Sequence, residues 1–351
     1  MNKMYDILEK MVHLHASDLF VTVGKPPILK IDGALHELTE YPCFNQEDTE
    51  AGARQLFDRE QSSRTFFDHG EVDFSLSISQ IGRFRINIFR QRGSCAITVR
   101  RIYTELPDPV VLGIPDSVMC LTERQRGLIL VTGPAGCGKT TTLAALIDKI
   151  NHERACHVLT LEDPIEFLHR HGQSIINQRE IGTDSQTYER ALRAALRQSP
   201  DVILIGEMRD LETIAIALTA AETGHLVLST LHTVGAAKTI DRIIDVFPPN
   251  QQQQIRIQLS TVLQAVVSQQ LLPGIKGNLV PAFEIMLVNN AIRNMIRDGK
   301  TPQVDGVIQM GASSGMMTMD MCLAMLLRSG QISREDALLH AVNQEAVLRY
   351  L

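Results

Sequence analysis

Hydrophobic and polar residues alternate through most of the first hundred positions, in short stretches separated by turn residues. Apolar side chains at helical spacing predict a helix over 4–14, and a second helix is expected over 46–57. Asp32-Gly33 is interpreted as a hairpin turn. Stretches of period two predict strands at 18–23, 28–31, 72–78, 83–89 and 96–102. The pattern of residues 1–102 is therefore typical of a small α+β domain built on an antiparallel sheet.

The pattern of hydrophobic and polar residues changes beyond residue 120. Residues 103–120 contain three prolines, and we interpret them as a linker between domains. From 121 to 272, short apolar runs alternate with helical stretches, which is typical of a parallel sheet covered on both faces. These runs lie at 127–132, 157–161, 201–205 and 225–230.

The last hundred residues are predicted to be mainly helical. The four glutamines at 251–254 are interpreted as the polar first turns of a helix that reaches Leu272. Residues 273–351 are then expected to form a mainly helical C-terminal region, with glycines between the helices.

Composition narrows the class of protein without identifying it. The 351 residues are 44% hydrophobic and 21% charged, as in ordinary globular proteins. The 34 Lys and Arg against 40 Asp and Glu give a net charge of −6, which argues against a general nucleic-acid binder. No apolar run is long enough for a membrane span, and the N-terminus lacks the apolar core of a secretory signal. The six scattered cysteines indicate reduced thiols, so we expect a cytoplasmic protein.

The strongest chemical signal is a glycine-rich loop of the form G-x4-G-K-T, which follows the run at 127–132 and begins a helical stretch. Its glycines let backbone N–H groups face the β- and γ-phosphates of a nucleotide, and a helix N-terminus favours negative charge. Lys139 is expected to reach these phosphates and the Thr140 hydroxyl to coordinate Mg²⁺. The predicted cofactor-binding residues are Gly133, Pro134, Ala135, Gly136, Cys137, Gly138, Lys139, Thr140 and Thr141.

Carboxylates follow two other predicted strands. Glu207 lies where a base would polarise an attacking water, although a surface carboxylate also fits that position. Gly206 stands before it, where P-loop enzymes commonly carry a magnesium-binding aspartate, so the direct metal ligand is left open. Glu162 and Asp163 could hold the water shell of Mg²⁺, orient Glu207, or form only an acidic turn ahead of Pro164.

His225 and His232 flank the predicted strand from Leu226 to Leu231. Each is either a structural histidine or a sensor of the γ-phosphate at a strand end. Metal binding is disfavoured because no third ligand lies nearby in the sequence.

Arginines gather on two predicted strands of the first domain. Arg83 and Arg85 share one face of a strand, and Arg100 and Arg101 close the next one. Taken alone they fit a solvated basic face, and the alternative is that they stabilise γ-phosphate charge from a neighbouring domain or subunit.

Four motifs in series resemble those of the ATPases of type II secretion and type IV pili. They are GPAGCGKTTT, TLEDPIEF, PDVILIGEMRD and TGHLVLSTLHT. Within that family, the segments ASDLFVTVGKPPILKIDGAL, AIRNMIRDGKTPQ and GMMTMD resemble the motors of pilus retraction, or twitching motility. Extension and secretion motors usually carry a further N-terminal domain and a four-cysteine metal finger, and neither is seen in this sequence.

The resemblance implies a PAS-like N-terminal domain at 1–102, a RecA-like P-loop ATPase core at 121–272 and a homohexamer with ATP between subunits. It implies that Glu207 is the catalytic glutamate and that Arg85 and Arg100 reach the phosphates of the nucleotide, whereas Arg83 and Arg101 match less closely. The other site residues that it implies lie in the acidic and histidine motifs: Glu162, Asp163, His225 and His232.

The implied function is Mg²⁺-dependent ATP hydrolysis coupled to domain rotation, which powers retraction of the pilus through an inner-membrane platform protein. The motor is expected in the cytoplasm, at the inner face of the cytoplasmic membrane. The alternatives are an accessory or regulatory ATP-binding paralogue and a pilus-extension or type II secretion ATPase. A nucleic-acid translocase is disfavoured by the net charge.

Overall fold

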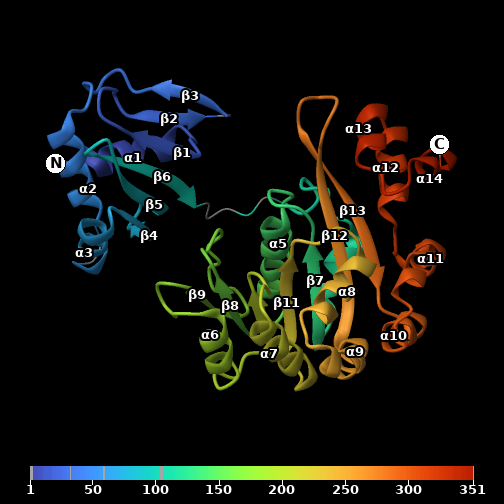
Figure 1. Ribbon diagram of the computed structural model, residues 1–351. Helices are drawn as coiled ribbons and strands as arrows, with labels where there is room; N and C mark the ends of the chain where they lie inside the picture. The colour runs from blue at the N-terminus through green and yellow to red at the C-terminus, as the bar shows by residue number, and fades with distance from the viewer. Residues whose placement is uncertain (1–2, 32, 58–59, 103–105, 107, 351) are drawn as a thin grey trace. The chain divides into compact units, whose positions relative to one another are not determined.

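The computed structural model describes residues 3–350 except 32, 58–59, 103–105 and 107 (Figure 1). Contacts between Cα atoms divide the chain into two units. The first is Met1–Glu105 with Glu166–Leu168, and the second is Leu106–Ile165 with His169–Leu351. Asp32 of the predicted hairpin turn and four positions of the predicted linker lie outside the described residues.

The first unit is a six-stranded antiparallel sheet with helices on one face, in the strand order β3-β2-β1-β6-β5-β4. Phe84, Ile86 and Ile88 of β5 are buried against the helices, so Arg83 and Arg85, at the alternate positions, lie on the other face. This confirms the predicted α+β domain. Its elements are α1 Lys3–His13, β1 Asp18–Val21, β2 Ile28–Ile31, β3 Ala34–Glu37, α2 Gln46–Leu56, α3 Glu60–His69, β4 Glu71–Ile78, β5 Gly82–Gln91 and β6 Ser94–Ile102.

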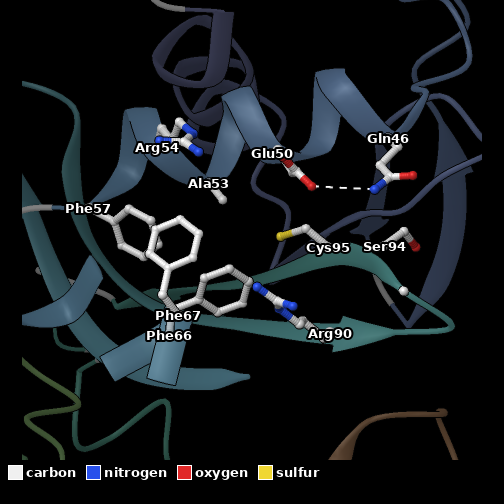
Figure 2. A pocket seen from close by; sticks show the side chains of 11 residues that line it. Gln46, Glu50, Ala53, Arg54, Phe57, Phe66, Phe67, Arg90, Ser94 and Cys95 are labelled. Carbon is white, nitrogen blue, oxygen red and sulfur yellow. Dashed lines mark hydrogen bonds between the residues drawn. The ribbon is translucent and has the colours of Figure 1, made fainter. Parts of the chain in front are cut away.

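A cavity of about 190 Å³ lies between α2, α3 and the β5–β6 turn of this unit (Figure 2). The Arg54 guanidinium lies 5.4 Å from the centroid of the Phe67 ring, and that of Arg90 lies 5.6 Å from the Phe66 ring. Both cations are thus held over aromatic faces. Burial raises the pKa of the Cys95 thiol, which lines the same cavity, to about 11, so the thiol is neutral.

The second unit contains a seven-stranded sheet in the order β13-β12-β7-β11-β10-β8-β9, parallel except for β13. All residues of β7, β10 and β11 are buried, as a strand covered on both faces requires. The elements that form and cover the sheet are α4 Asp116–Met119, β7 Gly127–Thr132, α5 Lys139–Glu153, β8 His157–Glu162, β9 Ile175–Glu180, α6 Tyr188–Ala195, β10 Val202–Ile205, α7 Leu211–Glu222, β11 Leu226–Leu231, α8 Ala236–Asp245, α9 Pro249–Val262, β12 Leu263–Pro273 and β13 Leu279–Leu287.

Helices cover both faces of this sheet (Figure 1). Side chains of α4 and α5 pack on one face, and those of α6, α7, α8 and α9 on the other. Residues Ile114, Val118 and Met119 of the predicted linker are buried in the core on the α5 side. The chain ends in the helices α10 Asn290–Arg297, α11 Val304–Met310, α12 Met319–Arg328, α13 Arg334–Leu339 and α14 Gln344–Arg349.

The expected helix through Leu272 is wrong. Helix α9 ends at Val262, and β12 begins at the next residue and pairs in parallel with β7. An apolar run that is buried on both faces has no period of two, so its sequence cannot distinguish a strand from a buried helix. Residues 279–287 likewise form β13 before the helical region begins.

Candidate active site

The phosphate-binding loop joins β7 to α5 and depends on three glycines with positive φ. Gly133, Gly136 and Gly138 have φ values of 142°, 77° and 88°, which a residue with a side chain rarely adopts. A Cβ atom at Gly133 would lie 2.1 Å from the carbonyl oxygen of Gln269 on β12. Glycine is therefore required at Gly133 by conformation and by close packing against β12.

Lys139, the first residue of α5, has its ammonium group folded back over this loop. Its Nζ donates to the carbonyl oxygens of Gly133 and Pro134, both at 2.9 Å, and the residue is only 8% exposed. The same Nζ lies 3.4 Å from Nδ1 of His232. The positive charge is thus held where the loop would receive phosphate groups.

His232 connects this lysine to the candidate base. Its Nε2 lies 3.2 Å from Oε1 of Glu207. Because an ammonium group only donates and an ionised carboxylate only accepts, the contacts of a neutral His232 require Nδ1 to accept from Lys139 and Nε2 to carry the hydrogen. The structure therefore brings together three residues that the sequence predicted separately.

Glu207 lies two residues past the end of β10 and is 16% exposed at its side chain. Its Oε2 accepts from Arg209 Nη2 at 2.7 Å. Burial alone would raise the pKa of Glu207, but the hydrogen bond with Arg209 and the proximity of His232 lower it below its usual value. The carboxylate is therefore ionised at neutral pH, as a base must be. Arg209 was not predicted as a site residue.

The two acids of the predicted acidic motif differ in their surroundings. Leu161 of β8 pairs with Ile205 of β10, so the acids that follow Leu161 lie at the same edge of the sheet as Glu207. Glu162 is 8% exposed, and its Oε1 accepts from Thr160 at 2.6 Å. Asp163 is exposed, and no hydrogen bond or ion pair joins its carboxylate to the described residues. Glu162 is thus held in place, whereas Asp163 is available to a ligand.

His225 is not brought to this site. It precedes β11 at the end where Leu226 pairs with Gly127, whereas the phosphate-binding loop follows the other end of β7. A six-residue strand separates the two ends by about 20 Å. The His225 ring instead lies near the end of α7, where Nδ1 is 3.0 Å from the carbonyl oxygen of Ala220. Within one chain its predicted catalytic role is therefore not supported.

The strand register in the first unit determines on which face of the sheet each arginine lies. Arg85 and Arg100 are directly paired on β5 and β6, so they share the face away from the helices. Arg85 Nη2 lies 2.6 Å from Oδ2 of Asp73, and Arg100 Nε lies 2.9 Å from Oδ1 of Asp18. Arg101 pairs with the buried Phe84 and therefore lies on the opposite face.

Gln269 on β12 is a site residue that the sequence did not reveal. Its Oε1 accepts from Thr142 Oγ1 on α5 at 2.8 Å, and its backbone lies against Gly133. It also lines a cavity of about 230 Å³ beside the loop. Because the expected structure around Gln269 was helical, no sequence pattern could place it next to a loop some 130 residues earlier. The other lining residues are Val111, Leu112, Ile114, Gly138, Thr141, Thr142, Leu271, Leu279 and Pro281.

Replacing Gln269 by leucine is expected to raise the KM for nucleotide about 10-fold, since the first turn of α5, which follows the loop, loses the hydrogen bond from Thr142 to Gln269. Gln270→Leu is the matched control, because its Oε1 contacts His340 at 3.0 Å and not the loop. Steady-state kinetics of the two variants measure the difference. Equal KM values for them would contradict a specific role of Gln269.

The described residues contain neither a cluster of metal-ligating side chains nor a helix that could span a membrane. No group of three or more His, Cys, Asp or Glu side chains among them is placed to hold a metal ion. In the same part of the chain, each helix is either too short or too polar to cross a membrane.

Comparison with known proteins places the chain among close relatives. A family model described as type II/IV secretion system protein matches residues 6–280. The chain is 46% identical over 322 residues to the type IV pilus retraction ATPase PilT of Pseudomonas aeruginosa. This alignment covers 92% of the present chain and 93% of the Pseudomonas protein. The chain is also 39% identical over 336 residues to the type IV pilus ATPase PilU of the same organism. That alignment covers 95% of the present chain and 87% of PilU.

A crystal structure of the pilus retraction motor PilT with bound ADP matches with a TM-score of 0.92 at 47% identity. The match covers 98% of both chains, so it includes both units.

Proposed function

The chain belongs to the type II/IV secretion system protein family, and we propose that it is an ATP-hydrolysing motor that powers retraction of type IV pili. The observation that carries this proposal is the series of contacts from Lys139 through His232 to Glu207. These contacts join the phosphate-binding loop directly to an ionised base.

The described residues account for the chemical step. The backbone N–H groups of the loop and the N-terminus of α5 bind the phosphates, and Lys139 exchanges its two carbonyl contacts for phosphate oxygens. Glu207 orients a water molecule and accepts its proton as the water oxygen bonds to the γ-phosphorus. The bond from the γ-phosphorus to the β–γ bridging oxygen breaks, so ADP leaves with that oxygen and the γ-phosphoryl group becomes inorganic phosphate. His232 transmits the movement of Lys139 to the base, so the site responds to the presence of the γ-phosphate.

The residues also fit a Mg²⁺ ion carried by the nucleotide. Mg²⁺ commonly keeps several waters and takes one or two protein groups besides phosphate oxygens, so it needs no cage of protein ligands. No described residue hydrogen-bonds the Thr140 side chain in the first turn of α5, and this hydroxyl would hold the ion. When bound, Mg²⁺ supplies positive charge that offsets the charge developing on the phosphates.

The cavity beside α5 is suited to the base of the nucleotide. It adjoins Gly138 and Thr141, and Leu112, Ile114 and Leu271 contribute apolar walls. A purine base presents two apolar faces that such walls bind. We therefore assign this cavity to the adenine of ATP.

Arg85 and Arg100 are proposed to stabilise the phosphate charge of an ATP held between subunits of a homohexamer. Changing either residue to alanine is expected to lower kcat about 10- to 100-fold, because a charge-assisted hydrogen bond to the transition state is lost. Arg101→Ala is the control, since Arg101 lies on the other face of the sheet. An equal loss of kcat in all three variants would contradict the assignment.

The motor is further proposed to act in the cytoplasm, on a pilus platform protein in the inner membrane. Deleting the gene is expected to give surplus pili without twitching, because assembly continues while retraction stops. Fewer pili would instead indicate an extension motor. The ATPase activity of the purified chain, measured with Mg²⁺ and without a partner, separates a motor from an accessory paralogue, which would bind ATP but hydrolyse it only with another ATPase.

A further inference from the structure

Gly206 is the residue of the active-site edge that the mechanism above leaves unexplained. A Cβ atom at this position would lie 2.9 Å from Oη of Tyr188, the first residue of α6. It would also lie 3.3 Å from the carbonyl oxygen of Leu161. The phenol hydroxyl therefore occupies the space that a side chain at Gly206 would need, directly before the base Glu207.

The surroundings of this hydroxyl are highly charged. Asp163, Glu162 and Glu207 all exert an electrostatic effect on Tyr188, that of Asp163 being the largest, and Arg209 opposes them. Burial, reinforced by these carboxylates, raises the pKa of the Tyr188 phenol well above its usual value. The O–H group thus keeps its proton and remains a hydrogen-bond donor at neutral pH.

The Tyr188 hydroxyl and the Asp163 carboxylate are a hydrogen-bond donor and a hydrogen-bond acceptor at the same edge of the sheet. No described residue accepts a hydrogen bond from the Tyr188 hydroxyl, and Asp163, at the end of the neighbouring strand β8, makes no hydrogen bond to the described residues either. A water molecule can satisfy both groups, because it accepts from one and donates to the other.

We propose that Tyr188 is a positioning residue that acts through Glu207. Its hydroxyl, placed against Gly206, fixes the spacing of the ends of β8 and β10 and donates through water to the carboxylates of Asp163 and Glu207. The base is thereby kept in the direction of the phosphate-binding loop. This inference rests on the proposed ATP hydrolysis and assigns Tyr188 to the orientation of its base.

The first experiment removes only the hydroxyl. Tyr188→Phe is expected to lower kcat about 10-fold while KM and the Kd for a non-hydrolysable ATP analogue stay within about twofold, since the base and not the nucleotide is misoriented. Tyr350→Phe is the control, because the hydroxyl of Tyr350 accepts from Gln309 in the C-terminal helices. An unchanged kcat in Tyr188→Phe, or a rise in KM and Kd as large as the loss of kcat, would overturn the inference.

The second experiment tests the close approach to Gly206. Gly206→Ala is expected to lower kcat in the otherwise unaltered chain, because the added methyl group displaces the hydroxyl. In the Tyr188→Phe background the same change is expected to cause a clearly smaller loss, since the 2.9 Å approach to the hydroxyl is gone and only the 3.3 Å approach to the carbonyl oxygen of Leu161 remains. Equal losses in the two backgrounds would overturn the inference.

ATP hydrolysis by the chain and the role of Tyr188 in it are tested by different results. If the unaltered chain hydrolyses no ATP, the proposed function fails and takes this inference with it. If the unaltered chain is active and Tyr188→Phe matches it, only the role of Tyr188 fails.

Discussion

Replacing Glu207 by glutamine is expected to lower kcat for ATP hydrolysis about 10³-fold while ATP binding stays within about twofold. The carboxylate is 16% exposed and ionised, and it contacts His232 and Arg209. An amide keeps the size of the side chain and an acceptor oxygen for Arg209, but it cannot take a proton from water. Single-turnover hydrolysis, together with binding of a fluorescent ATP analogue, measures the two quantities.

The control for this substitution is Glu212→Gln, in which an exposed carboxylate in the first turn of α7 is neutralised a few residues away. It should leave both hydrolysis and binding unchanged. If Glu207→Gln retained near-normal turnover, Glu207 would not be the base, and Asp163, the exposed one of the two other acids at this edge, would become the candidate.

Lys139→Ala is expected to lower kcat/KM about 10³-fold, mainly by weakening nucleotide binding. Lys139 as a residue is 8% exposed, and loss of its ammonium group removes the charge that faces the phosphates and leaves the carbonyl oxygens of Gly133 and Pro134 without their donor. Truncating one partner of a buried charged pair costs about 3–5 kcal/mol, which corresponds to about two to four powers of ten. Calorimetric titration with ATP and steady-state kinetics measure the effect.

Lys149→Ala provides the comparison, because Lys149 lies on the same helix about 15 Å further along. Nucleotide binding in that variant should match the unaltered chain. Undiminished ATP affinity in Lys139→Ala would show that the phosphates bind elsewhere.

The elements with the strongest periodicity were predicted correctly. The apolar run at 127–132 is β7, and the buried runs at 157–161 and 201–205 are β8 and β10 within one residue at each end. In the first unit, the predicted strands at 28–31 and 83–89 are β2 and β5. Such segments are recognisable because burial on both faces or on one face dictates their composition locally.

The missed elements are those whose environment is set by distant parts of the chain. Strand β9 carries polar residues and pairs only with β8 at the sheet edge, and β12 has the composition of a buried helix. Both are strands because a neighbouring strand offers unpaired backbone groups, which no local pattern reports.

The residues of the candidate site also fall into two groups, those that local sequence identifies and those that only distant contacts reveal. The loop from Gly133 to Thr140 is recognisable from residue types at set spacings, because phosphate binding needs consecutive backbone N–H groups and a lysine at one position. Glu207 is proposed as the base because it follows a buried strand. The sequence places His225 and His232 at opposite ends of one predicted strand, and only the structure shows that the His232 end adjoins the phosphate-binding loop and Glu207.

By itself, therefore, the sequence determined the strand, loop and helix of the phosphate-binding motif and pointed to Glu207 as the proposed base, since periodicity and motif spacing are local properties. Only the tertiary structure decided which side chains meet: Gln269 against the loop, Arg209 on Glu207 and Tyr188 over Gly206. These contacts join strands and helices through the pairing of the parallel sheet, and that pairing depends on the whole chain.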